Sequence, residues 1–159
     1  MFKNDKWDTI YMNMTRELAK GSHCTRVKVG AMIVKDGRIV STGINGTPEG
    51  YTNCDDIFTQ DKIKELGEAY YEKHHEFSEK YEIHAEQNAL IYLAKNGGAG
   101  IRGATMYITH SPCIHCAKMI ANSGITRVVF YNLYDRNQDG IEFLKNLGIQ
   151  VDLYVKEEV

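Results

Sequence analysis

The sequence predicts an α/β protein with three layers, α-β-α, built around a central five-stranded mixed sheet. Two features indicate this fold class. Two β-rich runs lie on either side of Asp36-Gly37, which is a typical hairpin turn. From residue 85 onward, helical and β-rich segments alternate, with a glycine after each helix. Strands joined by helical crossovers lie parallel, whereas hairpin strands are antiparallel, so the sheet is expected to be mixed.

The first elements follow from the spacing of apolar residues. Near the start of the chain these recur at helical spacing, at Trp7, Ile10, Tyr11, Met14 and Leu18. They predict an amphipathic helix over residues 6–20, ended near Gly21. The β-rich run 27–34 predicts the first strand, and residues 38–43 predict the return strand of the hairpin.

The middle of the chain has a different character. Residues 45–60 are rich in turn residues and predict a long loop, and the charged segment 61–81 predicts a largely solvated helix. The later elements are predicted as helices over 85–95, 113–123 and 141–146, and as strands over 105–109, 127–131 and 150–154. Without repeats or a linker, residues 1–159 are expected to form a single domain with an insertion at about 46–82.

Composition places the chain among ordinary globular proteins. It has 159 residues, of which 43% are hydrophobic and 25% charged, and these values argue against disorder or a fibrous repeat. The formal net charge of −2 provides no overall attraction to nucleic acid or to an anionic membrane. Any phosphate site would therefore have to be local.

The compartment bears on the chemistry of the cysteines. The first six residues lack the apolar stretch of a secretory signal, and no apolar run approaches the roughly 20 residues needed to span a bilayer. We therefore expect a cytoplasmic protein, in the host cytoplasm if a phage encodes it. Cys24, Cys54, Cys113 and Cys116 could form two disulfides, but a reducing compartment favours metal ligation.

Two short motifs, His84-Ala85-Glu86 and Pro112-Cys113-Ile114-His115-Cys116, each open a predicted helix. Cys113 and Cys116 share a helical face, so both can reach one ion, and His84 can supply a third ligand. Three protein ligands leave one tetrahedral position for water, which is typical of a catalytic zinc site rather than a structural one. The motifs therefore predict a catalytic zinc centre.

Glu86 lies two residues from the predicted ligand His84 and is free to move protons. It can take a proton from the activated water, protonate a ring nitrogen and deliver a proton to departing ammonia. Alone, a Cys-x-x-Cys pair also fits redox sites and structural zinc sites. Together, in this order, the motifs match the H-x-E…P-C-x-x-C signature of zinc nucleobase deaminases, and Glu86 has no use in a structural site.

Beyond these motifs, the whole chain resembles the deoxycytidylate (dCMP) deaminase family, in particular its phage-type members, within the cytidine deaminase superfamily. The segments that show the resemblance are 22–31, 43–48, 82–86 and 111–118. The resemblance implies a cytidine-deaminase-like fold and zinc-dependent hydrolysis of dCMP to dUMP and ammonia. This reaction belongs to pyrimidine deoxynucleotide biosynthesis, where dUMP is a precursor of dTTP.

The resemblance also implies substrate contacts. Asn45 would bind the sugar, although an Asn-Gly pair is also typical of a turn with positive φ. Tyr134 resembles a lid tyrosine over the base or phosphate, the alternative being an ordinary edge aromatic. Arg26 and Lys28 lie where the family has basic residues near the substrate phosphate. Both could equally be solvated surface charges, and for Lys28 we favour that interpretation.

A second zinc outside the active centre is implied by the same resemblance. The matching positions are Cys24, Cys54, His74 and Glu82, whose side chains could close a tetrahedral shell and hold the insertion to the core. His75 could replace His74, and the two cysteines could instead be small buried apolar residues. The other histidines, His23, His110 and His115, are assigned no role.

Regulation and assembly are expected from the resemblance alone. It implies a homo-oligomer, commonly a hexamer, activated by dCTP with Mg²⁺ and inhibited by dTTP, with no membrane or nucleic-acid partner. Two other functions stay open. One is a related deaminase of cytidine, free cytosine, guanine or a tRNA adenosine, and the last of these would favour a basic face. The other is a zinc-binding module without catalytic activity.

Overall fold

The computed structural model describes residues 4–98, 100–134 and 136–156. Its sheet has five strands in the order β2-β1-β3-β4-β5. β1 pairs antiparallel with β2 and β3, whereas β3, β4 and β5 are parallel. The strands are β1 Gly30–Lys35, β2 Arg38–Ile44, β3 Thr105–His110, β4 Arg127–Asn132 and β5 Gln150–Leu153. The predicted five-stranded mixed sheet is confirmed.

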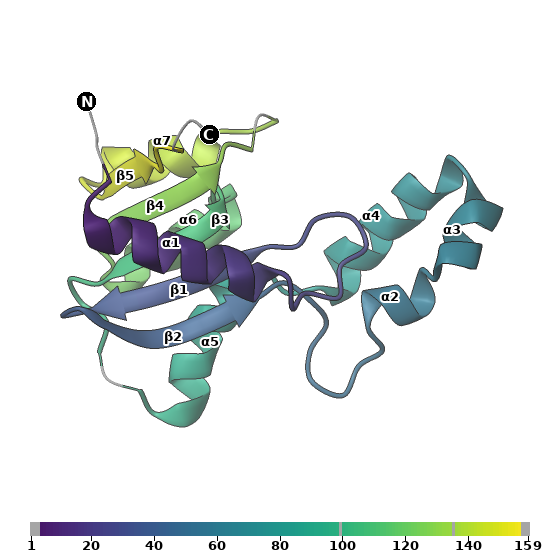
Figure 1. The fold of residues 1–159 in the computed structure, drawn as a ribbon, viewed down its shortest axis with the longest axis horizontal. Helices are drawn as coiled ribbons and strands as arrows, with labels where there is room; N and C mark the ends of the chain where they lie inside the picture. The colour runs from purple at the N-terminus through teal and green to yellow at the C-terminus, as the bar shows by residue number, and fades with distance from the viewer. Residues whose placement is uncertain (1–3, 99, 135, 157–159) are drawn as a thin grey trace.

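Helices cover both faces of this sheet (Figure 1). α1 lies across one face, and α5, α6 and α7 cover the other. The helices are α1 Lys6–Ala19, α2 Cys54–Ile57, α3 Gln60–Leu66, α4 Ala69–Tyr81, α5 Ala85–Asn96, α6 Ile114–Ser123 and α7 Asp139–Asn146. The three-layer α-β-α arrangement is therefore confirmed. Among the described residues, no helix is long and apolar enough to cross a membrane.

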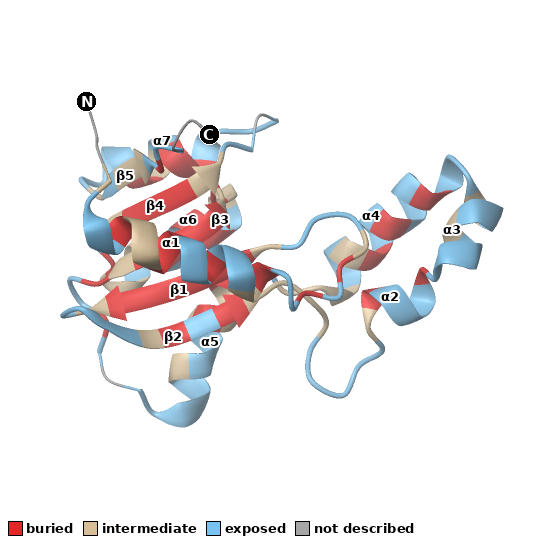
Figure 2. Ribbon diagram, in the orientation of Figure 1, coloured by how far each residue is buried: buried red, intermediate tan, exposed pale blue. Residues whose placement is uncertain are grey.

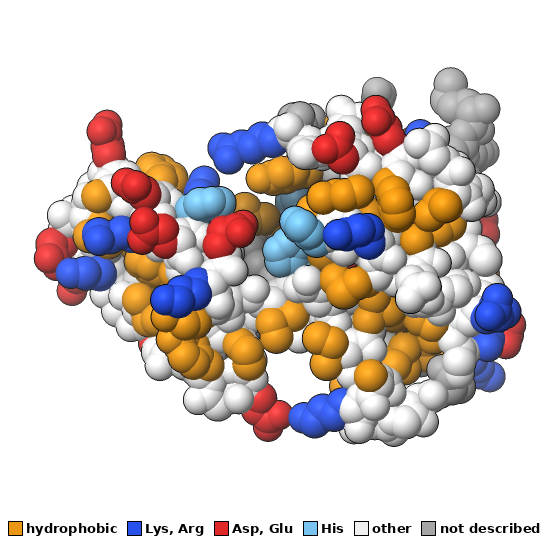
Figure 3. Space-filling view, turned by 180° about the vertical axis from the view of Figure 1, so that it is seen from behind, with side chains coloured by type: hydrophobic (Ala, Val, Ile, Leu, Met, Phe, Trp, Pro, Cys, Tyr) orange, Lys and Arg blue, Asp and Glu red, His pale blue; other side chains and the backbone are white. Residues whose placement is uncertain are grey.

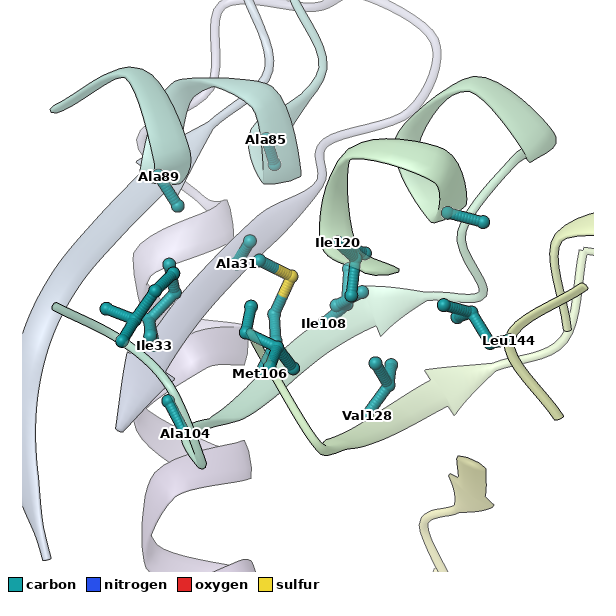
Figure 4. Packing of buried hydrophobic residues seen from close by; sticks show 13 residues of the cluster. Ala31, Ile33, Ala85, Ala89, Ala104, Met106, Ile108, Ile120, Val128 and Leu144 are labelled. Carbon is teal, nitrogen blue, oxygen red and sulfur yellow. The ribbon is translucent and has the colours of Figure 1, made fainter. Parts of the chain in front are cut away.

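The core is divided between the two faces by the alternation of side chains along each strand. Met106 and Ile108 of β3 pack under α5 and α6, in the larger cluster shown in Figure 4. Tyr107, between them, faces the smaller cluster under α1. The central strands are buried along most of their length (Figure 2). A sheet buried on both faces provides a rigid platform for the loops at its edge.

The insertion differs from the sequence prediction in three ways. Residues 45–60 are not all loop, because α2 lies within them. The helix expected over 61–81 is two helices, since Gly67 adopts a positive φ of 56° that ends α3. The segment is also less solvated than expected, because Tyr70 and Phe77 of α4 pack with Cys54 and Phe58. Together α2, α3 and α4 project beside the sheet (Figure 1).

The first strand also begins later than predicted, at Gly30 rather than residue 27. The reason is a side chain: Asn45 accepts a hydrogen bond from the backbone N–H of Val29 and donates one to the carbonyl of Val27. These backbone groups are thus bonded to an amide side chain instead of a neighbouring strand. The segment becomes a loop that passes along the edge of the sheet.

Candidate active site

The amino termini of α5 and α6 meet at the carboxyl-terminal edge of the parallel strands. His84 is the N-cap residue of α5, and its backbone N–H donates to the side chain of Gln87 at 2.8 Å. Cys113 is the N-cap residue of α6, and its Sγ accepts from the backbone N–H of Cys116. Both motifs therefore start helices, as predicted. Figure 3 shows this side of the molecule hollowed beside the insertion, with histidine side chains around the hollow.

Two glycines allow the helices to come this close. A Cβ on Gly43 of β2 would lie 2.2 Å from the carbonyl oxygen of Ala85, in the first turn of α5. A Cβ on Gly140 of α7 would lie 2.2 Å from the carbonyl oxygen of Pro112, in the loop before α6. Only glycine fits at either contact, so these residues set the position of the segments that bear His84 and Cys113. Sequence reasoning missed this role.

The three predicted zinc ligands converge. His84 Nδ1 lies 3.6 Å from Cys113 Sγ and 3.2 Å from Cys116 Sγ, and the three ligand atoms all lie within 4.8 Å of one another. Ligands of a tetrahedral zinc ion are separated by about 3.6–3.8 Å, given Zn–S and Zn–N bonds of about 2.3 and 2.05 Å. The donor set fits zinc with one coordination position left open. All four cysteines are free thiols, so the disulfide alternative is excluded.

The charge state of this cluster favours a cation. A hydrogen bond with Cys116 lowers the pKa of Cys113 to about 3, and the same bond raises the pKa of Cys116. A hydrogen bond with Cys113 also raises the pKa of His84. The cluster therefore holds a thiolate at neutral pH, and the thiolate is the form of cysteine that binds zinc.

Glu86, in the first turn of α5, lies beside the cluster of His84, Cys113 and Cys116. Its side chain is buried, with 5% exposed, and contacts the thiol of Cys116. Burial raises its pKa above the ordinary value of 4.5. A raised pKa brings a carboxyl group closer to the pH at which it exchanges protons efficiently. This is the property required of the predicted proton shuttle.

A second cluster joins the insertion to the sheet domain. His74 Nε2, on α4, lies 3.5 Å from Cys24 Sγ and 3.4 Å from Cys54 Sγ, and the three residues are buried. His75 is exposed, whereas His74 is the histidine that lies beside the two cysteines. Cys24 precedes β1 and Cys54 begins α2, so the cluster links three separate segments.

Glu82 lies beside the second cluster. Its Oε1 is buried. Among the described residues, it is the one buried side-chain oxygen or nitrogen without a hydrogen-bond partner. Burial raises its pKa, and a hydrogen bond with Ser78 is the largest of the interactions that oppose this rise. An unpartnered buried carboxylate oxygen beside two sulfurs and an imidazole fits the missing fourth ligand of a closed zinc shell. Cys24, Cys54 and His74 therefore converge, and Glu82 lies beside them.

Asn45 is committed to local structure. Besides its bonds to Val27 and Val29, its Oδ1 accepts from the hydroxyl of Ser22 at 2.7 Å. The interpretation of Asn45 as a turn residue with positive φ is wrong. Among the described residues other than glycine, Asp36 is the one with a positive φ. Asn45 thus shapes the loop beside the site, and its contact with a sugar stays a prediction.

The remaining predicted contacts lie apart from one another. The guanidinium of Arg26 lies over the ring of Tyr71, 4.9 Å from its centre, in the insertion. Tyr134 is exposed, and its backbone N–H donates to Ser111 Oγ at 2.7 Å, which holds this segment against the loop leading to Cys113. Lys28 instead lines a recess at the edge of the sheet, where Arg16 and Tyr131 also lie. No sequence spacing groups the residues of this recess.

A three-layer α-β-α fold with converging nitrogen and sulfur donors beside a buried carboxylate is suited to zinc-dependent hydrolysis. Residues 5–132 match the family described as the cytidine and deoxycytidylate deaminase zinc-binding region, and the chain belongs to this family. The predictions of family, fold class and zinc are confirmed.

Similar proteins agree with this assignment. The deoxycytidylate deaminases of Enterobacteria phages T2 and T4 are each 41% identical to this chain; the matches cover 84% of it and 85% and 82% of theirs. The crystal structure of the dCMP deaminase of cyanophage S-TIM5 in complex with dCMP and dUMP is 37% identical. It covers 96% of this chain and 99% of that one, with a TM-score of 0.76.

Proposed function

We propose that this protein is a dCMP deaminase, which hydrolyses dCMP to dUMP and ammonia with the aid of zinc. The observation that supports this most directly is the buried carboxyl group of Glu86 beside the converging ligand atoms of His84, Cys113 and Cys116. A structural zinc site does not need an adjacent proton carrier. The reaction would supply dUMP for the synthesis of pyrimidine deoxynucleotides.

The chemistry divides between the metal and the protein. His84, Cys113 and Cys116 would hold a zinc ion, which would lower the pKa of a bound water and so provide a nucleophile at neutral pH. Glu86 accepts the proton that this water gives up and passes it to the ring nitrogen. The new C4–O bond forms as the ring nitrogen is protonated. Glu86 then takes the remaining proton of the new C4 hydroxyl, which becomes a carbonyl, and delivers it to the amine as the C4–N bond breaks. Ammonia leaves, and Glu86 returns to its starting state.

Substrate choice is supported by the relatives. The T2 and T4 phage proteins are named deoxycytidylate deaminases, and the S-TIM5 structure contains dCMP and dUMP. The proposal extends to a second zinc held by Cys24, Cys54, His74 and Glu82. It also includes a single domain with the insertion, a cytoplasmic homo-oligomer, and regulation by dCTP with Mg²⁺ and by dTTP. The relatives' coverage of nearly the whole chain supports treating it as one enzyme unit.

The test is a substrate panel. Purified zinc-loaded protein is incubated with dCMP, CMP, deoxycytidine and cytosine, and ammonia release and the ultraviolet absorbance of the ring are followed together. We expect dCMP to be the best substrate by kcat/KM. Removal of zinc with a chelator should abolish turnover, and added zinc should restore it. Equal use of dCMP and deoxycytidine would identify a nucleoside deaminase, and no ammonia from any substrate would overturn the enzyme assignment.

A further inference from the structure

A short stretch of chain, residues 82–84, reaches both groups of metal-ligating side chains. Glu82 interacts with the residues of the second cluster, and His84 belongs to the other cluster, called the catalytic cluster below. The second cluster and the catalytic cluster consist, respectively, of Cys24, Cys54 and His74, and of His84, Cys113 and Cys116. The position of this stretch therefore affects both clusters.

The backbone of this stretch is extended where it joins the two helices. Glu82 ends α4 with φ −94° and ψ 139°, and His84 begins α5 with φ −71° and ψ 155°. Extended backbone rises about 3.3 Å per residue, so their Cα atoms lie about 7 Å apart. The helix that carries His74 thus leads directly into the helix that carries Glu86 (Figure 1). A displacement at Glu82 is passed to His84 because no loop lies between them.

Ile83, between these two residues, is bound to the end of the sheet. It forms an isolated antiparallel bridge with Gly46: the N–H of Ile83 donates to the carbonyl of Gly46 at 2.7 Å, and the N–H of Gly46 donates to the carbonyl of Ile83 at 3.1 Å. Two residues earlier, the carbonyl of Ile44 in β2 accepts from Asn88 Nδ2 of α5 at 2.7 Å. The start of α5 and the stretch before it are therefore held against one strand end.

A second connection runs from Cys24 to the same bridge. Ser22 is 3% exposed, and its Oγ accepts from the backbone N–H of Cys24 at 3.2 Å. The same hydroxyl lies 2.7 Å from Asn45 Oδ1, to which it donates, and Asn45 immediately precedes Gly46. The second cluster is therefore connected to both sides of the bridge, through Glu82 on one side and through Cys24 on the other.

A metal ion at the second cluster would hold Glu82 in place. Its Oε1 is buried and has no hydrogen-bond partner among the described residues, so this oxygen can bind a metal without breaking another bond. Metal–ligand distances hold to within about 0.2 Å, which restrains a side chain narrowly. A ligand that is already in position costs less entropy to order when its own ion binds. His84 would therefore bind zinc more tightly once Glu82 is held.

We propose that residues 82–84 couple the two clusters and that Glu82 is a positioning residue for the catalytic cluster. An ion held by the second cluster and Glu82 orients His84 and so raises the affinity of the catalytic cluster for zinc. The inference rests on the proposed function and adds to it a connection between the two metal sites. The coupling is reciprocal, so an ion at the catalytic cluster raises the affinity of the second cluster by the same factor.

Zinc-binding curves test this coupling without turnover. Bound zinc per chain is measured by elemental analysis at free zinc concentrations set by a metal buffer. The proteins are the wild type, His74→Ala, which keeps the catalytic cluster, and Cys113→Ser, which keeps the second cluster. For independent sites, the wild-type curve equals the sum of the two variant curves. We expect the more weakly bound ion of the wild type to require at least about fivefold less free zinc than that sum implies, since couplings are typically about 5–150-fold.

The role of Glu82 is tested by repeating the three measurements in the Glu82→Gln background, where the curves should be additive. Two control variants should keep the wild-type curve. His75→Ala changes the exposed neighbour of a ligand, and Phe77→Leu weakens the packing of the insertion against Phe58 without removing a ligand. An effect that arises only from the stability of the insertion would also appear in Phe77→Leu.

Each outcome bears on the proposal. A wild-type curve equal to the sum of the variant curves, or one zinc ion per wild-type chain, would overturn the coupling. Coupling that persists in the Glu82→Gln background, or that is lost in Phe77→Leu, would overturn the positioning role of Glu82. Turnover of dCMP with additive curves would leave the proposed function standing. Coupled curves with no ammonia from any substrate would overturn that function and leave the coupling.

Discussion

At the scale of single residues, Glu86 is the group whose predicted role can be tested most directly. It is buried against Cys116, and its pKa is raised by that burial. It is not among the three ligand atoms that converge, so it can lose and regain a proton without releasing the metal. Proton transfer by a positioned side chain contributes typically about 10²–10⁴-fold to rate.

We therefore predict that Glu86→Gln keeps its fold and its zinc but loses nearly all turnover, by at least about 100-fold. The amide preserves the size and much of the hydrogen bonding of the carboxyl group while removing the proton carrier. The measurements are kcat with dCMP and zinc content. Glu76→Gln, at an exposed position on α4, is the control and should retain full activity. More than a tenth of the wild-type rate in Glu86→Gln would refute the assignment.

At the scale of elements, the insertion has too small a core to be stable alone. Its buried apolar cluster consists of Cys54, Phe58, Tyr70 and Phe77, with Phe58 packed edge-on against the rings of Tyr70 and Phe77. Segments with so little apolar burial generally need a disulfide or a metal. The cluster of Cys24, Cys54, His74 and Glu82 lies where such a metal would join α2 and α4 to the sheet domain.

We predict close to two zinc ions per chain by elemental analysis of metal-replete protein. Cys54→Ser and His74→Ala should each contain about one, and each should melt at least about 5 °C lower, since 1 kcal/mol corresponds to roughly 2–4 °C in a domain of this size. His75→Ala is the matched control, because its side chain is exposed, and it should keep both ions. Cys113→Ser should lose the other ion together with activity. One zinc per wild-type chain would contradict the second site.

At the scale of the whole molecule, one ion-pair network joins the helix at the start of the chain to the end of the sheet. Arg127, at the start of β4, bonds to Asp8 of α1 at 2.8 and 3.0 Å and to Asp152 of β5 at 2.9 Å. Tyr107 of β3 donates to Asp8 at 2.7 Å. Burial would raise the pKa of Asp8, but the bonds from Arg127, Tyr107 and the backbone of Asp5 hold it below the ordinary value of 3.8.

This network yields a stability prediction with a defined pH dependence. Asp8→Asn should lower the free energy of unfolding at pH 7 by about 2–4 kcal/mol, because Arg127 loses a buried carboxylate partner. Because the pKa of Asp8 is lower in the folded than in the unfolded protein, Asp8 stabilises the fold at pH values above its unfolded-state pKa. This stabilisation is lost as the pH falls through the folded-state pKa. The difference in free energy of unfolding between wild type and Asp8→Asn should therefore become smaller below about pH 4.

Urea unfolding at pH 7 and below pH 4, at fixed zinc concentration, measures this difference. Glu17→Gln is the control, because the Glu17–Lys20 pair is exposed and exposed pairs contribute at most about 1 kcal/mol. A deficit for Asp8→Asn no larger than that of the control at pH 7 would show that the network contributes little to stability.

Much of this protein could be predicted from the sequence because the signals are local. Periodicity, the Asp36-Gly37 turn and the glycines after helices predicted the order of strands and helices, which determines the three-layer fold. The spacing of Cys113 and Cys116 placed both on one helical turn. It could therefore be predicted from a short stretch of sequence that the two cysteines share a site. The break at Gly67 was missed, since glycine within a helical pattern is often tolerated.

What only the tertiary structure decided depends on segments distant in sequence. His74 and His75 are adjacent in the chain, and only the packing of α4 buries His74 beside two cysteines and leaves His75 exposed. The close approaches at Gly43 and Gly140 exist because each glycine meets a carbonyl more than 25 residues away. Likewise, Arg16, Lys28 and Lys156 gather around Tyr131 only after the sheet has formed. Local pattern determines elements, and the packing of elements determines which charges meet.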